Sequence, residues 1–321
     1  MVGALVTTPT VVTLGETMAL ARATEVGSFP HVGALQLGIG GAESNVAIAL
    51  TRLGIPTRWI GRLGTDSLGD LVVRELVAEG ISVTAERDPD AQTGLMLKER
   101  RTAASTKVWY YRAGSAGSRL TVGDIDPGHI RSASLLHITG ITPALSQNAL
   151  EAVHAAVDLA RDAGVTVSFD LNYRSALWSP ERAAAEFAEL IPLCDIVFGG
   201  DDEFALVTGA LTHPLEIAHA VSALGPRQVI VKLGIDGCVA LVDGVEYERP
   251  AVPVQAIDTV GAGDAFVGAY LAEYLSGASV DARLATAVTA GAFACLVPGD
   301  WEGMPRRSEL AMLDAREPVQ R

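Results

Sequence analysis

Residues 258–266 read Asp-Thr-Val-Gly-Ala-Gly-Asp-Ala-Phe, a combination that could hold a phosphate beside a carboxylate. They open an apolar run, typical of a buried helix, that continues to Gly277. Glycines at such a helix start would expose backbone N–H groups at the positive end of the helix dipole, where anions bind. Asp264 on the first turn would lie next to the anion as a carboxylate. A base beside a phosphate indicates phosphoryl transfer to a hydroxyl group.

The same residues also have a purely structural interpretation. Glycines before a helix can serve only to turn the chain, and Asp264 can serve only to cap the helix. An isolated Gly-x-Gly-Asp sequence favours this simpler interpretation. The rest of the chain must therefore decide between the two.

A second glycine-rich segment, residues 38–47, reads Gly-Ile-Gly-Gly-Ala-Glu-Ser-Asn-Val-Ala and leads into another predicted helix. Glycines such as Gly41 let a polyhydroxylated ligand approach the backbone, and the Asn45 amide offers donors and acceptors to hydroxyl groups. Asn45 could equally bond the backbone at the helix start. Residues 61–69, which read Gly-Arg-Leu-Gly-Thr-Asp-Ser-Leu-Gly, are predicted to be a turn and a helix cap.

The composition of the 321-residue chain is that of a globular protein, with 49% hydrophobic and 19% charged residues. This length fits one large α/β domain or two smaller ones. The net charge of −14 argues against nucleic acid or an anionic membrane as partner, because both need a basic surface. Cys194, Cys238 and Cys295 are far apart in apolar segments, which indicates reduced core residues. With no signal sequence and no apolar run of membrane-spanning length, we expect a cytoplasmic protein.

Apolar β-type runs alternate with runs of helical period, which predicts a parallel sheet with helices on its faces. The expected strands, each buried on both faces, are Val11–Leu14, Thr57–Ile60, Leu135–Ile138, Thr166–Phe169, Ile196–Phe198 and Val229–Lys232. The expected helices are Glu43–Leu53, Ser67–Glu79, Asn148–Ala163, Pro180–Leu190 and Pro214–Leu224. The segment after Arg306 is predicted to be a peripheral amphipathic helix.

Two segments, residues 17–37 and 93–112, interrupt this alternation. Both show partly alternating patterns without a helix between their halves, which indicates antiparallel strands outside the main sheet. A small β-flap over the C-terminal edge of the sheet would make a lid, because open α/β sheets bind ligands at that edge. An ordinary edge hairpin would give the same pattern.

Together, the glycine-rich segments and residues 258–264 resemble the signatures of the ribokinase-like carbohydrate kinases, also called the phosphofructokinase-B family, over residues 10–310. The resemblance implies a ribokinase-like three-layer α/β/α sandwich with a mainly parallel central sheet and a small β-sheet lid. Residues 1–321 would form a single kinase domain, with lid strands drawn from about 17–37 and 93–112. The implied reaction is ATP-dependent phosphorylation of a sugar hydroxyl. In it Asp264 would be the base, and the developing charge would be held by the N–H groups of Gly261, Ala262 and Gly263.

The nucleotide site is implied by residues 231–237, Val-Lys-Leu-Gly-Ile-Asp-Gly, which resemble the nucleotide-binding strand and turn of this family. The resemblance implies that ATP is contacted by Lys232, Gly234 and Gly237. Lys232 could also be a strand-end lysine that reaches solvent. The chain has no Walker-type phosphate loop.

Residues 201–203, Asp-Asp-Glu, start a helix, and the resemblance implies that Glu203 helps to organise Mg²⁺ through water. Family members carry an Asn three residues before this Glu, whereas Gly200 stands here. A run of helix-start acids favoured by the helix dipole is the alternative interpretation.

Two arginines follow strand-like segments, Arg112 after Tyr110-Tyr111 and Arg174 at the end of Asp170-Leu-Asn-Tyr-Arg. Arginine pairs with a carboxylate or phosphate at two points, so both near one ligand suggest an acidic substrate as well as ATP. Read structurally, they are surface salt-bridge partners. Both stretches and Gly299-Asp300 resemble 2-keto-3-deoxygluconate kinases.

This resemblance implies contacts to the sugar acid from Gly41, Asn45, Tyr110, Arg112, Arg174, Asp264 and Asp300, and contacts to the transferred phosphate from Asn172 and Arg174. Met96 stands where some of these kinases carry a tyrosine, so one hydrogen bond to the substrate would be absent.

The sequence therefore predicts a kinase that uses ATP and Mg²⁺ to phosphorylate the terminal (C6) hydroxyl of 2-keto-3-deoxygluconate. A ribokinase or fructokinase acting on a neutral sugar is the first alternative. A non-catalytic sugar- or nucleotide-binding protein on the same fold is the second. The sequence leaves open a monovalent-cation requirement, tolerance of the galactonate epimer, and pairing of two copies through the lid edge.

Overall fold

The central sheet is mainly parallel, with the strand order β13-β12-β11-β10-β9-β8-β1-β4-β5. The computed structural model describes residues 10–102, 105–209 and 211–314. Neighbouring strands pair in parallel from β11 to β5, and β12 and β13 add an antiparallel edge. The strands are β1 (Val11–Leu14), β4 (Thr57–Gly64), β5 (Ser82–Asp88), β8 (Leu135–Thr139), β9 (Thr166–Asp170), β10 (Ile196–Gly200), β11 (Gln228–Lys232), β12 (Cys238–Val242) and β13 (Val245–Arg249).

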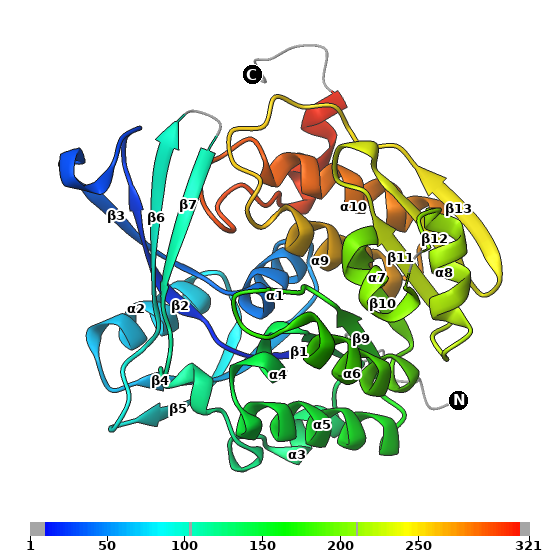
Figure 1. The fold of residues 1–321 in the computed structure, drawn as a ribbon, viewed down its shortest axis with the longest axis horizontal. Coiled ribbons are helices and arrows are strands. Elements are labelled where there is room, and N and C mark those ends of the chain that lie inside the picture. Colours follow the sequence, from blue (N-terminus) through cyan, green and yellow to red (C-terminus); the bar gives the residue numbers. More distant parts are fainter. Residues whose placement is uncertain (1–9, 103–104, 210, 315–321) are drawn as a thin grey trace, which may run out of the picture.

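Helices cover both faces of this sheet, so that the molecule has three layers (Figure 1). One face is covered by α1 (Ala42–Arg52), α2 (Ser67–Ala78), α9 (Ala262–Leu275) and α10 (Val280–Ala294). The other is covered by α3 (Pro127–Arg131), α4 (Ile141–Leu145), α5 (Gln147–Asp162), α6 (Pro180–Leu190), α7 (Asp201–Thr208) and α8 (Pro214–Ser222). The side chains of successive strand residues, such as Val11 and Val12, pack into the two hydrophobic cores on opposite faces of the sheet. The predicted α/β/α fold class is confirmed.

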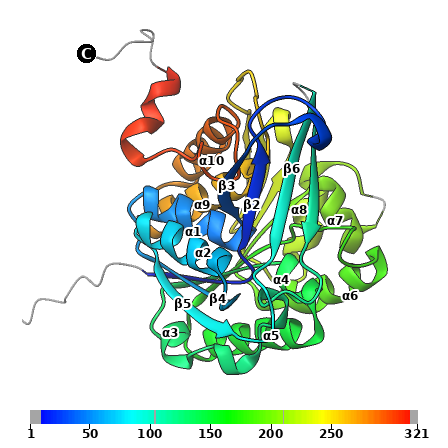
Figure 2. The same cartoon turned by 90° about the vertical axis from the view of Figure 1, so that its left-hand side faces the viewer.

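A small second sheet, the lid, stands apart from the main sheet (Figures 1 and 2). Its order is β3-β2-β6-β7, and the strands are β2 (Met18–Ala23), β3 (Leu35–Gly40), β6 (Leu95–Thr102) and β7 (Ser105–Tyr111). The expected antiparallel pairing holds within each hairpin, whereas the inner pair β2–β6 is parallel. Each of these two strands is the first of its hairpin, so both leave the body of the protein in the same direction.

The inner face of the lid is apolar near its base. Met18, Leu20 and Met96 form a small buried cluster, and Val108 packs against it. Because side chains alternate along a strand, the next inward positions on β2 and β6 are Arg22 and Lys98. The lid therefore presents methionine and leucine at its base and cationic side chains further along.

The expected strands and helices all occur within two residues of their predicted bounds, except that β4 continues to Gly64. The sequence reasoning did not predict β5, the β12–β13 hairpin, α3 or α4. The segment after Arg306 forms a 3-10 helix over Arg307–Asp314 rather than an α-helix. Cys194 and Cys238 are buried and Cys295 is half-buried, all as free thiols. Among the helices of the described ranges, none combines the length and apolar character needed to cross a bilayer.

Candidate active site

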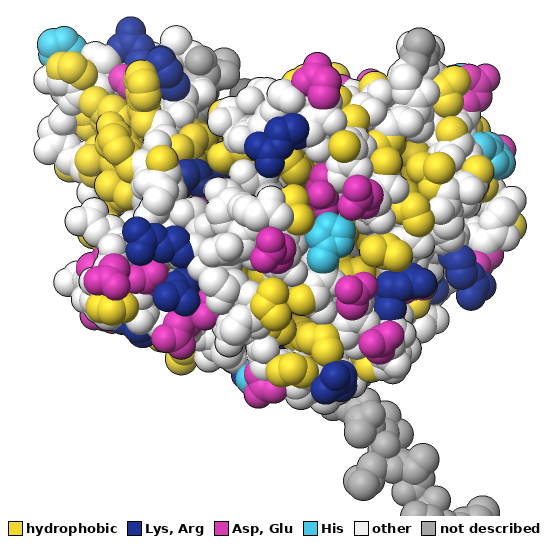
Figure 3. Space-filling model, turned by 60° about the horizontal axis from the view of Figure 1, so that its bottom comes forward, with side chains coloured by type: hydrophobic (Ala, Val, Ile, Leu, Met, Phe, Trp, Pro, Cys, Tyr) yellow, Lys and Arg dark blue, Asp and Glu magenta, His cyan; other side chains and the backbone are white. Residues whose placement is uncertain are grey.

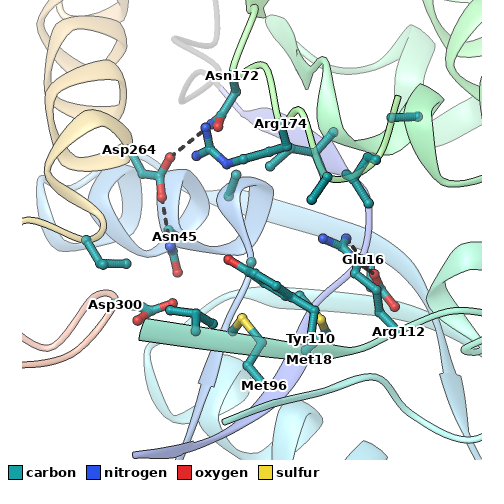
Figure 4. A pocket seen from close by; sticks show the side chains of 18 of the residues that line it. Glu16, Met18, Asn45, Met96, Tyr110, Arg112, Asn172, Arg174, Asp264 and Asp300 are labelled. Atoms are coloured by element: carbon teal, nitrogen blue, oxygen red, sulfur yellow. Dashed lines mark hydrogen bonds and ion pairs between the residues drawn. The ribbon is translucent and has the colours of Figure 1, made fainter. Parts of the chain in front are cut away.

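A cavity of about 780 Å³ lies between the inner face of the lid and the carboxyl ends of β9, β10 and β11. This is the edge at which open α/β sheets bind ligands. The predicted site residues that line it are Gly41, Asn45, Tyr110, Arg112, Asn172, Arg174, Glu203, Lys232, Gly261, Gly263, Asp264 and Asp300. Figure 4 shows Asp264, Asn172 and Arg174 on one side of the cavity and Tyr110, Arg112 and Glu16 on the other. Gly234, Gly237 and Ala262 do not line it.

Asp264 on the first turn of α9 is held by two asparagines from distant segments. Asn45 Nδ2 donates to its Oδ2 at 2.7 Å, and Asn172 Nδ2 donates to its Oδ1 at 3.5 Å. Asn172 has a φ of 39°, which few residues other than glycine and asparagine adopt. Both asparagine Oδ1 atoms are buried without a hydrogen-bond partner among the described residues. The Asp264 carboxylate thus bonds side chains rather than the helix end, which argues against a capping role.

The pKa of Asp264 suits a proton acceptor. Burial raises it from 3.8 to about 6, the Asn45 hydrogen bond opposes this rise, and the charge of Asp170 adds to it. Arg174 and Lys232 lower the pKa through their positive charges. A carboxyl group with a pKa near 6 is ionised at neutral pH and still basic enough to accept a proton.

The backbone before Asp264 forms a tight turn that requires glycine. Gly261 has a φ of 76°, and a Cβ at this position would collide with the carbonyl oxygen of Asp300. The Ala262 N–H donates weakly to the Thr259 carbonyl at 3.3 Å. The N–H groups of Gly261 and Gly263 have no acceptor within the described part of the chain. These groups at the N-terminus of α9 are available to an anion.

Lys232 at the end of β11 supplies positive charge to this turn. Its Nζ lies 2.7 and 2.8 Å from the two carboxylate oxygens of Asp170, and 3.8 Å from where a Cβ on Gly263 would be. Burial lowers the pKa of Lys232, but the nearby carboxylates of Asp170 and Glu203 outweigh burial and raise it overall. The lysine is therefore a charged group facing the cavity, and not a strand-end lysine in solvent.

The acidic residues at the end of β10 offer oxygen ligands of the kind that Mg²⁺ prefers. Glu203 accepts the N–H of Gly200 at 2.7 Å and that of Tyr173 at 2.8 Å, so its carboxylate is fixed and also caps α7. Gly200 has no side chain, but Asp202 Oδ1 lies 2.5 Å from where a Cβ on residue 200 would be. A hydrated magnesium ion fits this donor set, because oxygen atoms are present although the expected Asn is not.

The lid end of the cavity contains a buried ion pair that the sequence did not predict. Arg112 Nε and NH2 lie 2.7 and 2.6 Å from Glu16 Oε2, and the Glu16 side chain is completely buried. Ser115 Oγ also donates to Glu16. The Arg112 guanidinium lies 5.8 Å from the ring centre of Tyr110, whose side chain is half exposed. Arg112 is thus rigidly aimed at the cavity and partly neutralised.

Two further predicted contacts, Arg174 and Asp300, also line the cavity. Arg174 is exposed, and its NH1 donates to the Tyr173 carbonyl at 3.0 Å. Asp300 is buried, and Lys98 Nζ lies 3.0 Å from its Oδ1. Met96 is buried beside Asp300 at the lid base, since a Cβ on Gly40 would touch both side chains. Met96 has no group to bond a hydroxyl.

The sequence reasoning missed Glu16, Asp170 and Lys98 as parts of the site. Glu16 follows β1 and Asp170 ends β9, so the rule that ligands bind at strand carboxyl ends could have found both. Lys98 gave no such signal, because its partners come from segments that are distant in the sequence. Gly237 has a φ of 100°, and its missing Cβ makes room for the Arg249 carbonyl of β13, which is a structural role.

The fold and the site fit a phosphotransferase, because a buried carboxylate lies beside a helix start with N–H groups available to an anion. Residues 8–307 match the model of the pfkB family of carbohydrate kinases. The chain belongs to this family.

Relatives and solved structures agree with this assignment. The chain is 36% identical over 311 residues to a 2-dehydro-3-deoxygluconokinase of Bacillus subtilis (strain 168), which covers 94% of both chains. It is 34% identical over 298 residues to a 2-dehydro-3-deoxygalactonokinase of Haloferax volcanii, which covers 91% of this chain and 93% of the relative. A crystal structure of a putative ribokinase II from E. coli, in complex with ATP and Mg²⁺, superposes with a TM-score of 0.89 at 26% identity, covering 96% of this chain and all of the other.

Proposed function

We propose that this protein is an ATP-dependent kinase that phosphorylates the C6 hydroxyl of 2-keto-3-deoxygluconate (2-dehydro-3-deoxygluconate). The observation that carries the proposal is the buried Asp264, with its raised pKa, between the free N–H groups of the α9 start and a cavity that contains two arginines. The names of the relatives from Bacillus subtilis and Haloferax volcanii support a sugar-acid substrate.

The sugar acid would lie between the lid and α1, with its carboxylate toward Arg112 and Tyr110 and its hydroxyl groups toward Asn45 and Asp300. The unpartnered Oδ1 of Asn45 can accept a hydrogen bond from one of these hydroxyls. Gly41 also lines this part of the cavity, and glycine is required there because a Cβ would collide with the Glu16 carbonyl. This placement directs the far end of the sugar acid at Asp264.

In the reaction, Asp264 accepts the proton of the C6 hydroxyl while the hydroxyl oxygen bonds to the γ-phosphorus of ATP. The bond from that phosphorus to the bridging oxygen breaks, and ADP leaves with the electron pair. The N–H groups of Gly261 and Gly263 and the ammonium of Lys232 stabilise the charge on the transferring group. Arg174 and Asn172 contact the phosphate from the side of the β9 loop. The product keeps the sugar acid and gains a phosphate ester.

ATP would lie along the end of β11 and the turn after it, which brings Lys232 to its phosphates. Magnesium, when bound, neutralises phosphate charge and aligns the γ-phosphate. We propose that Glu203 holds it through water, and that the Asp202 carboxylate supplies the oxygen that Gly200 lacks. Gly234 and Gly237 shape the turn rather than the cavity. Because the donor is ATP, we place the reaction in the cytoplasm.

The substitution Asp264→Asn tests the role of the base. It keeps the size of the side chain and one of its two acceptor oxygens, but it cannot accept the proton. We expect ADP formation with 2-keto-3-deoxygluconate to fall by about 10²-fold to 10⁴-fold, while ATP still binds. Turnover within a few-fold of wild type would show that another group is the base.

A neutral-sugar kinase is a second candidate, favoured by the Arg112–Glu16 ion pair, which already occupies part of the guanidinium. Replacing Arg112 by Met distinguishes the two. It should raise the KM for the sugar acid by about tenfold or more and leave the KM for ribose or fructose nearly unchanged, because only the acid would lose a charged partner. The opposite pattern would favour the neutral sugar.

We also propose that two copies pair through their lids. Leu37 on β3, Leu97 on β6 and Trp109 on β7 lie on one side of the lid in cross-strand register with Ala21. Leu37 and Trp109 are 60% and 43% exposed, and Figure 3 shows hydrophobic side chains gathered over the lid. A partner lid would cover this apolar surface. Light scattering should therefore give a dimer mass, and Trp109→Glu should give a monomer.

A further inference from the structure

Lys98 on lid strand β6 is a buried lysine held between two carboxylates of the protein body. Its side chain is 5% exposed, and Nζ lies 2.7 Å from Asp258 Oδ2 and 3.0 Å from Asp300 Oδ1. Lysine is almost never buried in this way without such partners. Position 98 is separated by 160 residues or more from both carboxylates, so this one ammonium group joins three distant segments.

Asp258 is the first residue of the segment that leads to the α9 start. Its Oδ1 accepts the Val260 N–H at 3.2 Å, and its Oδ2 accepts the Gly299 N–H at 3.2 Å. Val260 directly precedes Gly261, whose backbone packs against the Asp300 carbonyl. The Asp258 carboxylate therefore fixes the anion-binding turn relative to the Gly299–Asp300 loop. Lys98 contacts this connection from the lid.

The charges around this point are unbalanced without Lys98. The charged groups that face Asp300 are Lys98 from the lid, Asp258 from the segment before α9, and Glu302 from the loop of Asp300 itself. Burial raises the pKa of Asp300, and Lys98 lowers it. With the ammonium removed, the buried carboxylates of Asp258 and Asp300 and the half-buried one of Glu302 would face one another. Repulsion would then favour protonation or movement of one of them.

The lid makes a second contact with the same loop. Arg22 on β2 donates from NH1 to the Pro298 carbonyl at 2.8 Å and from NH2 to Gln36 at 2.8 Å. Lys98 Nζ also lies 3.4 Å from the Gly299 carbonyl. Movement of the lid away from the body would withdraw both cations from the 298–300 loop.

We propose that Lys98 is a positioning residue that couples lid closure to the alignment of Asp300 and of the anion-binding turn. When the lid is closed, the Lys98 ammonium neutralises Asp258 and Asp300. The anion-binding turn and the Asp300 carboxylate are then fixed relative to each other. An open lid leaves these two carboxylates without their counter-ion, and the turn loses its support. The enzyme is then aligned for transfer only when the lid covers the sugar. This inference takes the identity of the sugar from the proposed function, whereas the contacts of Lys98 do not depend on that function.

The test compares Lys98→Met with Lys98→Arg and with Lys107→Met, a control at an exposed lid lysine that packs on Trp109. With 2-keto-3-deoxygluconate we expect Lys98→Met to lower kcat by about tenfold or more and to shift the acid limb of kcat/KM to higher pH. The shift follows because Asp300, like Asp264, must be ionised for activity, and the pKa of Asp300 rises when it loses its cation. Lys98→Arg should recover most of the rate, and Lys107→Met should match wild type. A Lys98→Met variant with wild-type kcat and an unmoved acid limb would overturn the proposal.

Amide hydrogen exchange without ligand gives a readout that does not depend on the substrate. In Lys98→Met, the hydrogen-bonded amides of Asp258, Val260, Gly299 and Asp300 should exchange faster than in Lys107→Met. The core strands β1 and β8 should stay equally protected. Equal exchange in the two variants would refute the coupling. Faster exchange everywhere would show a general loss of stability and would also refute it. If the wild type does not phosphorylate the sugar acid, the proposed function fails, and this exchange comparison still decides the role of Lys98.

Discussion

The substitution Asp264→Asn should stabilise the fold at neutral pH even though it removes activity. Folding raises the pKa of Asp264 from 3.8 to about 6, so the folded state binds this proton more tightly than the unfolded state. Stability is therefore highest below the unfolded pKa, and it falls as the pH rises through the folded pKa. Above pH 6 the buried charge costs about 3 kcal/mol at most, since each pKa unit corresponds to about 1.4 kcal/mol.

An asparagine at position 264 avoids this cost and finds partners. Its amide NH₂ can donate to the unpartnered Oδ1 of Asn172 or of Asn45, and its oxygen can accept from the other residue. We expect a gain that approaches about 3 kcal/mol near pH 8 and shrinks to about 1 kcal/mol near pH 4.5. In urea this corresponds to a midpoint shift of up to about 1 M.

The assay is urea unfolding at both pH values, followed by tryptophan fluorescence at low protein concentration. Asp281→Asn is the matched control, because Asp281 also lies on the first turn of a helix, α10, but is exposed. It should give no gain, since an exposed acid at a helix start is slightly favourable. If Asp264→Asn is no more stable than wild type near pH 8, or if its gain in stability does not depend on pH, the buried charge of Asp264 does not destabilise the fold.

Three other results are expected. The kcat/KM for the sugar acid should fall below about pH 6 as Asp264 is protonated. In Asn45→Ala the midpoint of this acidic fall should move up by about one pH unit, because the substitution removes the 2.7 Å hydrogen bond to the carboxylate. An unchanged midpoint would contradict this. Lys232→Met should raise the KM for ATP by about tenfold or more and the KM for the sugar acid far less, which titration of each substrate at a saturating level of the other would measure. Equal effects on the two KM values would mean that Lys232 does not contact the phosphates of ATP. Gly261→Ala should lower the unfolding free energy by about 1–3 kcal/mol or more, because φ is 76° and a Cβ would collide with the Asp300 carbonyl. Gly263→Ala should be neutral or raise it by up to about 1 kcal/mol, because Gly263 lies in α9, where alanine is the better helix former. Similar effects of the two substitutions in urea unfolding would mean that the turn does not require glycine at 261.

Much of the fold could be predicted because its signals are local. The buried strands such as Val11–Leu14 are continuous apolar runs, and helices such as Pro180–Leu190 begin at a capping Ser and a Pro. Strand β13 was missed because Val245–Arg249 is mostly exposed and charged, so it lacks the pattern of a buried strand. Strand β12, Cys238–Val242, is a buried apolar run that the same local signal could have identified. The parallel pairing of β2 with β6 depends on which way each chain segment leaves the body, and no local pattern encodes this.

The site was predictable to the extent that its residues lie in continuous motifs. Asp264 and Asn45 stand in glycine-rich segments, and the structure brings them to 2.7 Å of each other. The ion pairs of Glu16 with Arg112 and of Lys98 with Asp258 connect residues from separate segments of the chain. Such pairs depend on the three-dimensional arrangement of the lid and the sheet, so spacing along the sequence could not reveal them.

Asp264 as the base and the arginines of the cavity should together serve phosphoryl transfer to a sugar acid. The most direct measurement is ADP formation by the wild-type protein with ATP and Mg²⁺ over a panel of 2-keto-3-deoxygluconate, 2-keto-3-deoxygalactonate, ribose and fructose, followed by NMR of the product. We predict that kcat/KM is highest for a 2-keto-3-deoxy sugar acid and that phosphorus–proton coupling places the ester at C6. Preferred turnover of ribose or fructose, a phosphate at another position, or no sugar-dependent ADP formation would contradict the account.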